Sequence, residues 1–336
     1  MTALETSPGF SRRRFISAQS IATVPYFVPS CVVLVLLLII NTIVNPGFIN
    51  NGGWQQAVTA ASPLIVLAAA MTPPILAGGG GIDLSVGPSA GLISVLVAGE
   101  LAPHGVHNTV VLVVLAILAG CMAGAVNGAL VAFLRVSPII ATLATYLVFS
   151  GLATQLMPSP GGVVPSGISA FARSTGPIPN AVFVIVALAV LWWLLLRTSY
   201  WRNLIATGGS DRAAFTAGVP VTAVRFLAFI LSGAIAGVGG IMLTAVLGGA
   251  DPTVGPTYTL TAIAGAAVGG ISLAGGRGGL LGAAAGGASL FLIQNILSFI
   301  QVSSFVLQIA YGAVLVIAIV LNGGWDHVRL KSGATA

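Results

Sequence analysis

Charged side chains are scarce in this chain of 336 residues, where Asp, Glu, Lys and Arg together make up 5%. Soluble domains carry about 25% charged residues, so the composition excludes a soluble enzyme or a soluble nucleic-acid-binding domain. The only two cysteines, Cys31 and Cys121, lie within apolar runs, which excludes a disulfide-stapled scaffold. Hydrophobic residues make up 57% and the mean hydropathy is +1.07, values typical of a membrane protein.

Lysine is almost absent, and the residue patterns needed for ATP binding, proton transfer or catalysis are missing as well. The single lysine, Lys331, lies close to the C-terminus, so the chain cannot form the lysine-containing phosphate loop that binds ATP. No apolar run carries an ionisable residue well inside it, which argues against a proton relay. No nucleophile, base and orienting acid occur together, so we expect neither an enzyme nor a cofactor in this chain. Glu100, His104 and His107 have metal-like spacing, but without a fourth donor nearby a solvated loop is favoured over a metal site.

Long apolar runs predict an all-helical membrane protein with about ten spans, since roughly 20 apolar residues cross a bilayer. The predicted spans are 24–44, 57–77, 86–101, 109–133, 137–157, 180–197, 223–247, 258–274, 279–299 and 304–322. They form one domain, residues 24–322, between an N-terminal tail (1–23) and a C-terminal tail (323–336).

The arginines predict how the spans are oriented, because cytoplasmic loops are enriched in Lys and Arg. With ten spans, eleven of the twelve basic residues fall on the side of the two termini, and only Arg173 falls on the other. We therefore expect both termini in the cytoplasm. Residues Arg12 to Arg14 resemble a twin-arginine export signal, but no small-residue cleavage site follows, and a membrane anchor is favoured.

Two short segments recur at nearly the same offset. Residues 80–89 match residues 248–257 at six of ten positions, and residues 133–137 match 299–303. The members of each pair lie five predicted spans apart, and an odd displacement places them on opposite sides of the membrane. This pattern predicts an inverted-topology repeat, as in many transporters, with spans 2–5 and 7–10 as its halves.

The repeated segment predicts a break in a helix. Asp83 at the centre of a lipid-facing helix costs about 2.5–3.5 kcal/mol, and the preceding glycines let the backbone turn. Asp83 and Ser85 are expected to cap the next helix, with Pro88 in its first turn. A role in gating is the alternative to capping. The residues predicted to form the break or a gate are Gly80, Gly81, Asp83, Ser85, Gly87, Asp251, Thr253 and Gly255.

Uncharged polar residues lie within several predicted spans. Interhelical hydrogen bonds are the usual role of such residues, and a pathway for a polyhydroxyl solute is the alternative. Glycines spaced four apart, at 120, 124 and 128 and at 278, 282 and 286, predict close helix packing. The candidate pathway residues are Asn127, Gln294, Asn295 and Gln308.

The predicted cytoplasmic loop 198–222 contains a short helix. Ser210 is a good N-cap, Asp211 suits the first turn, and Gly218 is a good C-terminal stop. Ala213, Ala214 and Ala217 are expected to form a small face that inserts into a cleft on a partner.

Several motifs resemble one family of membrane proteins. Gly208-Gly209-x-x-x-Ala213-Ala214-x-x-x-Gly218 and Gly80-Gly81-Ile82-Asp83-Leu84-Ser85-Val86-Gly87 together resemble the permease subunit of ribose-type sugar ABC importers. Asn127-Gly128, Ser137-Pro138-Ile139-Ile140-Ala141-Thr142-Leu143 and Gly269-Gly270-Ile271-Ser272-Leu273 continue the match, which runs from about residue 60 to the end. The sequence departs from the family at Thr259 and Thr261, where members commonly carry acidic residues, and at Asp251.

The resemblance implies a bacterial inner-membrane permease for a sugar or polyol. Its implied partners are a second permease copy or paralogue, an ATPase with two nucleotide-binding modules that holds ATP and Mg, and a periplasmic sugar-binding protein. No nucleic acid is expected. The implied ATPase-coupling residues are Gly208, Gly209, Ser210, Asp211, Arg212, Ala213, Ala214, Phe215 and Gly218. A secondary carrier that works without an ATPase, or a membrane scaffold, is the alternative.

Overall fold

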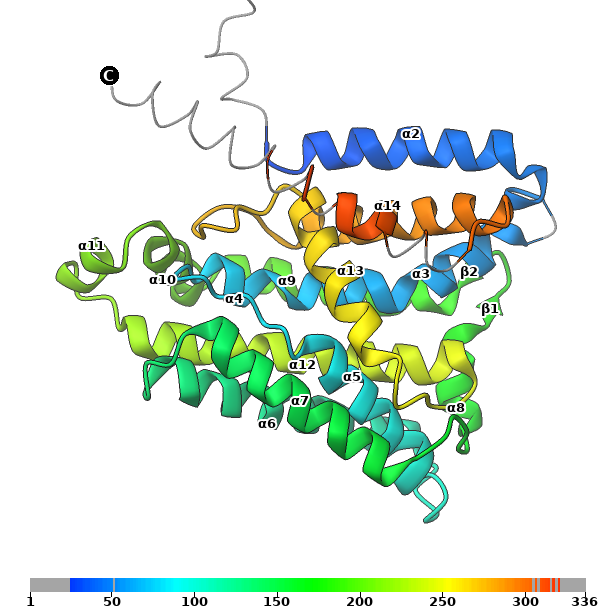
Figure 1. Cartoon of the computed structure of the whole chain (residues 1–336), viewed down its shortest axis with the longest axis horizontal. Helices are drawn as coiled ribbons and strands as arrows, with labels where there is room; N and C mark the ends of the chain where they lie inside the picture. Colours follow the sequence, from blue (N-terminus) through cyan, green and yellow to red (C-terminus); the bar gives the residue numbers. More distant parts are fainter. Residues whose placement is uncertain are drawn as a thin grey trace, which may run out of the picture.

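Long helices lying side by side make up the computed structural model of the chain (Figure 1). The structure describes residues 25–50, 52–303, 306, 309–314, 316, 317 and 320. Within these residues, five helices are long and apolar enough to cross a membrane, or six if α9 and α10 form one bent span. The chain is therefore a polytopic helical membrane protein.

The helices follow one another with short connections. In chain order they are α2 (Val28–Val44), α3 (Gly53–Ala70), α4 (Thr72–Leu76), α5 (Val86–Val95), α6 (Thr109–Ala132), α7 (Pro138–Leu156), α8 (Ser166–Ser169), α9 (Asn180–Leu196), α10 (Ser199–Gly209), α11 (Asp211–Thr216), α12 (Val221–Leu247), α13 (Gly255–Val268) and α14 (Leu280–Phe299). A π-helical turn, Leu96–Leu101, extends α5, and two short strands, β1 (Ser174–Thr175) and β2 (Ile178–Pro179), pair antiparallel.

A helix lies at each of the first nine predicted spans, but some limits and the loop 198–222 differ from the prediction. The span predicted at 258–274 begins at Gly255 and ends at Val268, because Gly270 adopts a left-handed backbone (φ 77°). The loop 198–222 holds two helices, α10 and α11, where the sequence predicts one. Helix α10 follows α9 after a bend of 81°. The tenth predicted span, 304–322, lies largely outside the described residues.

Helix α12 packs against α6 through glycines on both helices. A Cβ on Gly124 would lie 2.9 Å from the Cα of Ile230, and one on Gly233 would lie 2.9 Å from the nitrogen of Gly124. Gly120 meets the backbone of Gly233 and Gly237 in the same way. The predicted close packing at the first glycine stripe is therefore confirmed.

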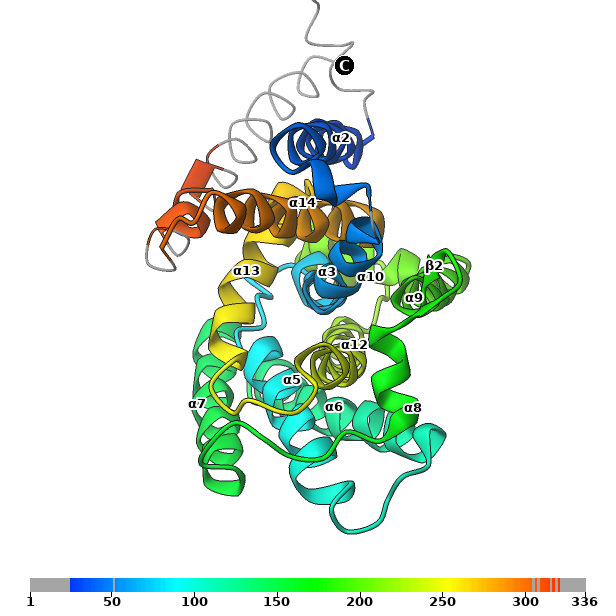
Figure 2. The same ribbon diagram turned by 90° about the vertical axis from the view of Figure 1, so that its right-hand side faces the viewer.

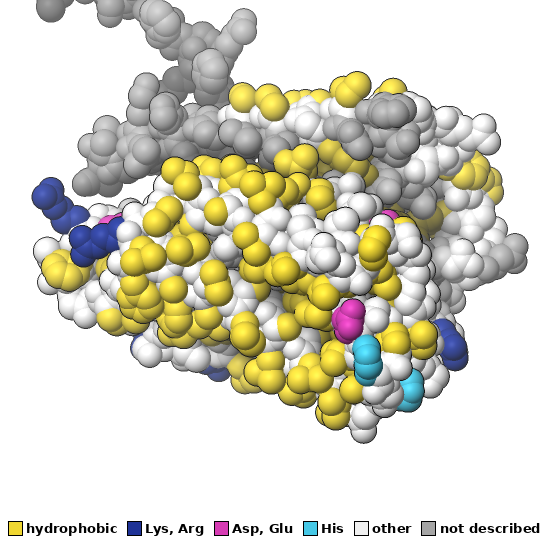
Figure 3. Space-filling view, turned by 60° about the horizontal axis from the view of Figure 1, so that its bottom comes forward, with side chains coloured by type: hydrophobic (Ala, Val, Ile, Leu, Met, Phe, Trp, Pro, Cys, Tyr) yellow, Lys and Arg dark blue, Asp and Glu magenta, His cyan; other side chains and the backbone are white. Residues whose placement is uncertain are grey.

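The outer face of the bundle is apolar. Exposed Val, Leu, Ile and Phe side chains occur along α2, α6, α7 and α9. Figure 3 shows hydrophobic side chains over much of one face, with most of the visible arginines near one end and histidines near the other. This distribution fits a lipid-facing surface between two aqueous ends.

Helices α5 and α13 begin next to each other and run in opposite directions (Figures 1 and 2). A Cβ on Gly255 would lie 2.8 Å from the Cα of Pro88, and one on Gly87 would lie 2.8 Å from the nitrogen of Thr259. The hydroxyl of Thr259 donates to the carbonyl oxygen of Leu84 at 3.1 Å. The two helix starts therefore touch through their backbones.

Candidate functional site

Three successive glycines turn the chain back after α4. Gly78, Gly79 and Gly80 have φ values of 72°, 62° and 73°, a left-handed conformation that side chains disfavour. The chain then passes through Asp83 and enters α5, whose N-cap residue is Ser85. The helix break predicted from the glycines is present. The expected cap is not as predicted, because the Ser85 side chain bonds to no amide of α5.

Asp83 instead lies at the centre of a buried hydrogen-bond network. Its side chain is 2% exposed. Oδ1 accepts hydrogen bonds from the backbone nitrogen of Ser85 at 3.0 Å and from its hydroxyl at 2.7 Å. Oδ2 accepts from the hydroxyl of Ser232 on α12 at 3.2 Å. A buried carboxylate needs such donors, because burial without them is costly.

Asn127 extends this network to two further helices. Its amide nitrogen, on α6, donates to the Ser85 hydroxyl at 2.7 Å and to Asp83 Oδ1 at 3.4 Å. Its amide oxygen accepts from the hydroxyl of Thr145, on α7, at 2.6 Å. We call Asp83, Ser85, Asn127, Thr145 and Ser232 the polar clamp, because they join the helix break to α6, α7 and α12.

The second copy of the repeated segment has the same local turn. Asp251 Oδ1 accepts from the backbone nitrogen of Thr253 at 2.8 Å and from its hydroxyl at 2.7 Å. Unlike Asp83, Asp251 is half-buried, and both of these hydrogen bonds stay within the turn. The other pair of recurring segments, 133–137 and 299–303, also shares a local structure. Arg135 and Gln301, at equivalent positions, both have left-handed backbones, with φ of 55° and 58°.

Helix α11 is the short capped helix that the sequence predicts. The hydroxyl of Ser210 accepts a hydrogen bond from the nitrogen of Ala213, Asp211 lies in the first turn, and Gly218 has φ 82°. The expected alanine face is wrong in one respect, because Ala214 is only 4% exposed and packs within the chain itself. Phe215, which is 73% exposed, is the large side chain that α11 presents outward.

An ion pair attaches α11 to α12. Asp211 Oδ2 accepts a hydrogen bond from the guanidinium of Arg225 at 2.5 Å and forms a salt bridge with it. The same guanidinium lies against the first helix break, since a Cβ on Gly79 would lie 3.1 Å from Cζ of Arg225.

A polar hollow of about 590 Å³ opens beside α11, between it and the turn that joins α6 to α7. Arg135 and Arg212 add positive charge to it beyond the Asp211–Arg225 pair. The lining residues are Gly79, Val131, Ala132, Arg135, Val136, Ser137, Pro138, Asp211, Arg212, Phe215, Val221, Thr222 and Arg225. Its charge suits an acidic surface on a partner.

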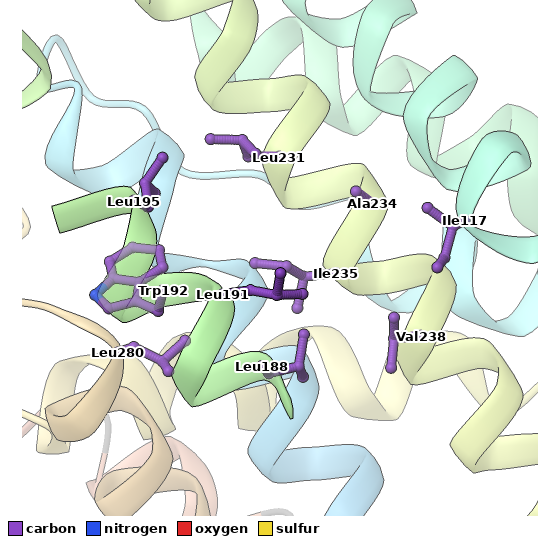
Figure 4. Close-up of a pocket in the computed structure, with 10 residues that line it drawn as sticks. All are labelled: Ile117, Leu188, Leu191, Trp192, Leu195, Leu231, Ala234, Ile235, Val238 and Leu280. Atoms are coloured by element: carbon purple, nitrogen blue, oxygen red, sulfur yellow. The ribbon is translucent and has the colours of Figure 1, made fainter. Parts of the chain in front are cut away.

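A second hollow, of about 310 Å³, lies between α9 and α12 (Figure 4). Its walls are aliphatic and aromatic, with Leu191 and Trp192 contributed by α9 and Ile235 by α12. A site for a polyhydroxyl solute needs hydrogen-bonding groups to replace water. This hollow therefore suits lipid tails rather than a solute.

Of the candidate pathway residues that the structure describes, Asn127 on α6 lies apart from Gln294 and Asn295 on α14. Asn127 is in the polar clamp, and Gln294 is exposed on α14. Asn295 is half-buried, and its amide oxygen accepts no hydrogen bond. Gln308 lies outside the described residues. Sequence reasoning missed Thr145 and Ser232, whose only signal was a hydroxyl within an apolar helix.

Comparisons with known proteins identify the family. A family model described as "Branched-chain amino acid transport system / permease component" matches residues 55–321. The chain is 37% identical over 248 residues to the ribose import permease protein RbsC of Bacillus subtilis, covering 72% of this chain and 76% of that one.

Two further relatives come from Escherichia coli. The D-allose transport system permease protein AlsC is 34% identical over 245 residues (72% of this chain, 75% of the relative). The galactose/methyl galactoside import permease protein MglC is 30% identical over 262 residues (72% and 78%). The family model spans most of the chain, including the polar clamp, α11 and both helix breaks. The chain therefore belongs to the permease-component family of binding-protein-dependent ABC importers, as a non-catalytic, multi-pass membrane subunit.

Proposed function

We propose that this permease imports a sugar or sugar-like polyol that a periplasmic binding protein delivers, and that a separate ATPase subunit supplies the energy. The observation that carries the proposal is the similarity to permeases named for ribose, allose and galactose, at 30–37% identity over 72% of the chain. The family description names branched-chain amino acids, but these three relatives point to a sugar. A secondary carrier has less support, because the family works with a binding protein and an ATPase.

We also propose a ten-span membrane domain over residues 24–322, built as an inverted repeat and flanked by cytoplasmic tails at 1–23 and 323–336. Three observations support the repeat. The turns at Asp83 and Asp251 have the same hydrogen bonds, Arg135 and Gln301 share a left-handed backbone, and α5 and α13 start together and diverge. Half-helices that meet inside a bundle are typical of transporters with inverted repeats.

Arginine placement supports a cytoplasmic position for the end of the bundle that carries α10 and α11. The described arginines at 135, 197, 202, 212, 225 and 277 lie in or beside the α6–α7 turn, the α9–α12 region and the α13–α14 loop, which share this end (Figure 1). Arg173 lies beside β1, at the opposite end. Cytoplasmic loops carry this excess of arginine, so α11 would face the ATPase.

In this proposal α11, within the coupling loop 198–222, docks on the ATPase through Phe215 and the rim of the polar hollow beside α11. The polar clamp holds the first helix break in place, and the segment around Asp251 and Thr253 forms its counterpart at the other end. Gln294, Asn295 and Gln308 stay candidates for the solute path. The permease functions beside a second copy or a paralogue.

Reconstitution in liposomes tests the proposed function. The permease is reconstituted with its ATPase, and uptake of radiolabelled ribose, allose and galactose is measured with a binding protein outside and ATP inside. We expect uptake of a sugar that needs both ATP and the binding protein. Uptake driven by a sugar gradient through the permease alone would instead establish the secondary carrier.

A further inference from the structure

The end of α10 touches the backbones of two loops that belong to opposite halves of the permease. A Cβ on Gly208 would lie 2.9 Å from the Cα of Gly276, in the loop between α13 and α14, and it would also meet the carbonyl oxygen of Leu76, at the end of α4. A Cβ on Gly78, which follows α4, would lie 2.9 Å from the Cα of Gly208. The end of α10, the end of α4 and the loop between α13 and α14 therefore meet backbone to backbone.

The two loops are also joined to each other directly at this point. The nitrogen of Gly276 donates a hydrogen bond to the carbonyl oxygen of Leu76 at 3.1 Å. A Cβ on Gly275 would lie 2.5 Å from the Cα of Gly78. Gly78, Gly275 and Gly276 have φ values of 72°, 100° and 71°, so these positions favour glycine on conformational grounds as well.

We propose that this three-way contact, which we call the glycine junction (Gly78, Gly208, Gly275 and Gly276), carries movement of α11 to both halves of the permease at once. The inference rests on the proposed docking of the ATPase at α11. Ser210 alone separates α10 from α11, so a force on α11 reaches Gly208 within a few residues. Backbones in direct contact shift together, because a packed contact has no flexible side chain to absorb the displacement.

The junction gives each half of the permease a defined route for this movement. On the first side, Gly78 leads through the glycine turn to Asp83 and the polar clamp at the start of α5. On the second side, Gly275 and Gly276 connect α13 with α14. The ion pair between Asp211 and Arg225, whose guanidinium lies against Gly79, adds a second link from α11 to the first break.

The chain provides a matched pair of variants to test the junction. Gly208 and Gly209 are neighbours at the end of α10, and neither has a left-handed backbone. A Cβ on Gly208 would overlap Leu76 and Gly276, whereas a Cβ on Gly209 would meet nothing within 4 Å. Gly208→Ala therefore separates the three segments, and Gly209→Ala makes the same chemical change in open space.

Both variants are examined in the full complex of permease, ATPase and binding protein in liposomes. For Gly208→Ala we expect that stimulation of hydrolysis by the sugar-loaded binding protein and sugar uptake both fall about tenfold. Gly209→Ala should lose less than Gly208→Ala in both measurements, because its Cβ meets nothing within 4 Å. Equal uptake and stimulation in the two variants would overturn the junction. Absence of ATP-dependent uptake in the wild type would overturn the proposed function itself.

A distance measurement covers the case in which Gly208→Ala fails to insert. Spin labels are placed at Thr216→Cys and Leu281→Cys, both exposed positions, after Cys31 and Cys121 have been replaced by serine. If the junction moves as one body, the distance between the labels stays the same in the nucleotide-free and ATP-trapped complexes. A change approaching one helical turn, roughly 5 Å, would show that α10 slides past the α13–α14 loop and would overturn the inference.

Discussion

Asn127→Ala removes the side chain that connects the polar clamp to both α6 and α7. Asn127 is 1% exposed and takes part in three hydrogen bonds with other segments: to Ser85 at 2.7 Å, to Asp83 at 3.4 Å and from Thr145 at 2.6 Å. Alanine makes none of them. The Thr145 hydroxyl keeps the carbonyl oxygens of its own helix as acceptors, but the buried Asp83 carboxylate loses a donor.

The size of the effect follows from these contacts. A buried hydrogen bond contributes about 1 kcal/mol net, and interhelical bonds measured in membranes average about 0.6 kcal/mol. Asn127→Ala loses two short hydrogen bonds and one long one, and it leaves a small cavity in place of the amide. We therefore expect it to lower the free energy of unfolding by about 2–3 kcal/mol.

Unfolding in mixed dodecylmaltoside and SDS micelles measures this quantity. Asn295→Ala is the matched control, because Asn295 is half-buried on α14 and its amide oxygen accepts no hydrogen bond. We expect the control to lose less than about 1 kcal/mol. If Asn127→Ala is no less stable than Asn295→Ala, the polar clamp does not hold the helix break, and the reasoning from hydrogen-bond distances is refuted.

Three further predictions concern the helix crossing, the docking face and the topology. Gly87→Ala should lower the free energy of unfolding by about 1–3 kcal/mol, because its Cβ would overlap the start of α13. Gly91→Ala is the control and should lower it less, because its Cβ would lie 3.4 Å from its nearest neighbours. Equal losses in the same micelle assay would contradict the close crossing of α5 and α13. Phe215→Glu should weaken pull-down of the ATPase without changing stability, since Phe215 is 73% exposed, and unchanged pull-down would exclude it from the docking face. Single cysteines at Arg212 and Thr175, both exposed, should react with a membrane-impermeant maleimide from opposite sides, and labelling of both from one side would reject the orientation.

Local features of the sequence predicted much of the fold. The apolar runs located a helix at each of the first nine predicted spans, because the bilayer favours long apolar helices. Ser210 and Gly218 marked the ends of α11, since capping depends on neighbours within a few residues. The recurrence of residues 80–89 at 248–257 was matched by the same aspartate turn at both sites.

Contacts between distant segments could not be read from the sequence. Asp83 and Ser85 were expected to cap a helix, but Asp83 accepts a hydrogen bond from Ser232, 149 residues away. Ala214 was expected on a docking face, yet it is buried because α11 folds back against α10 and the start of α12. A serine within an apolar run gives no signal of its partner, because the partner depends on how the helices are packed.

The sequence by itself determined that this chain is a helical membrane permease, where its helices lie and where they break, because the bilayer, the glycines and the caps act over short stretches of chain. Only the tertiary structure decided that the breaks meet at Gly87 and Gly255, and that Gly208 touches Leu76 and Gly276 while Gly209 touches neither. The physical reason is that a glycine allows two backbones to approach, but which backbones approach depends on the packing of all the helices together.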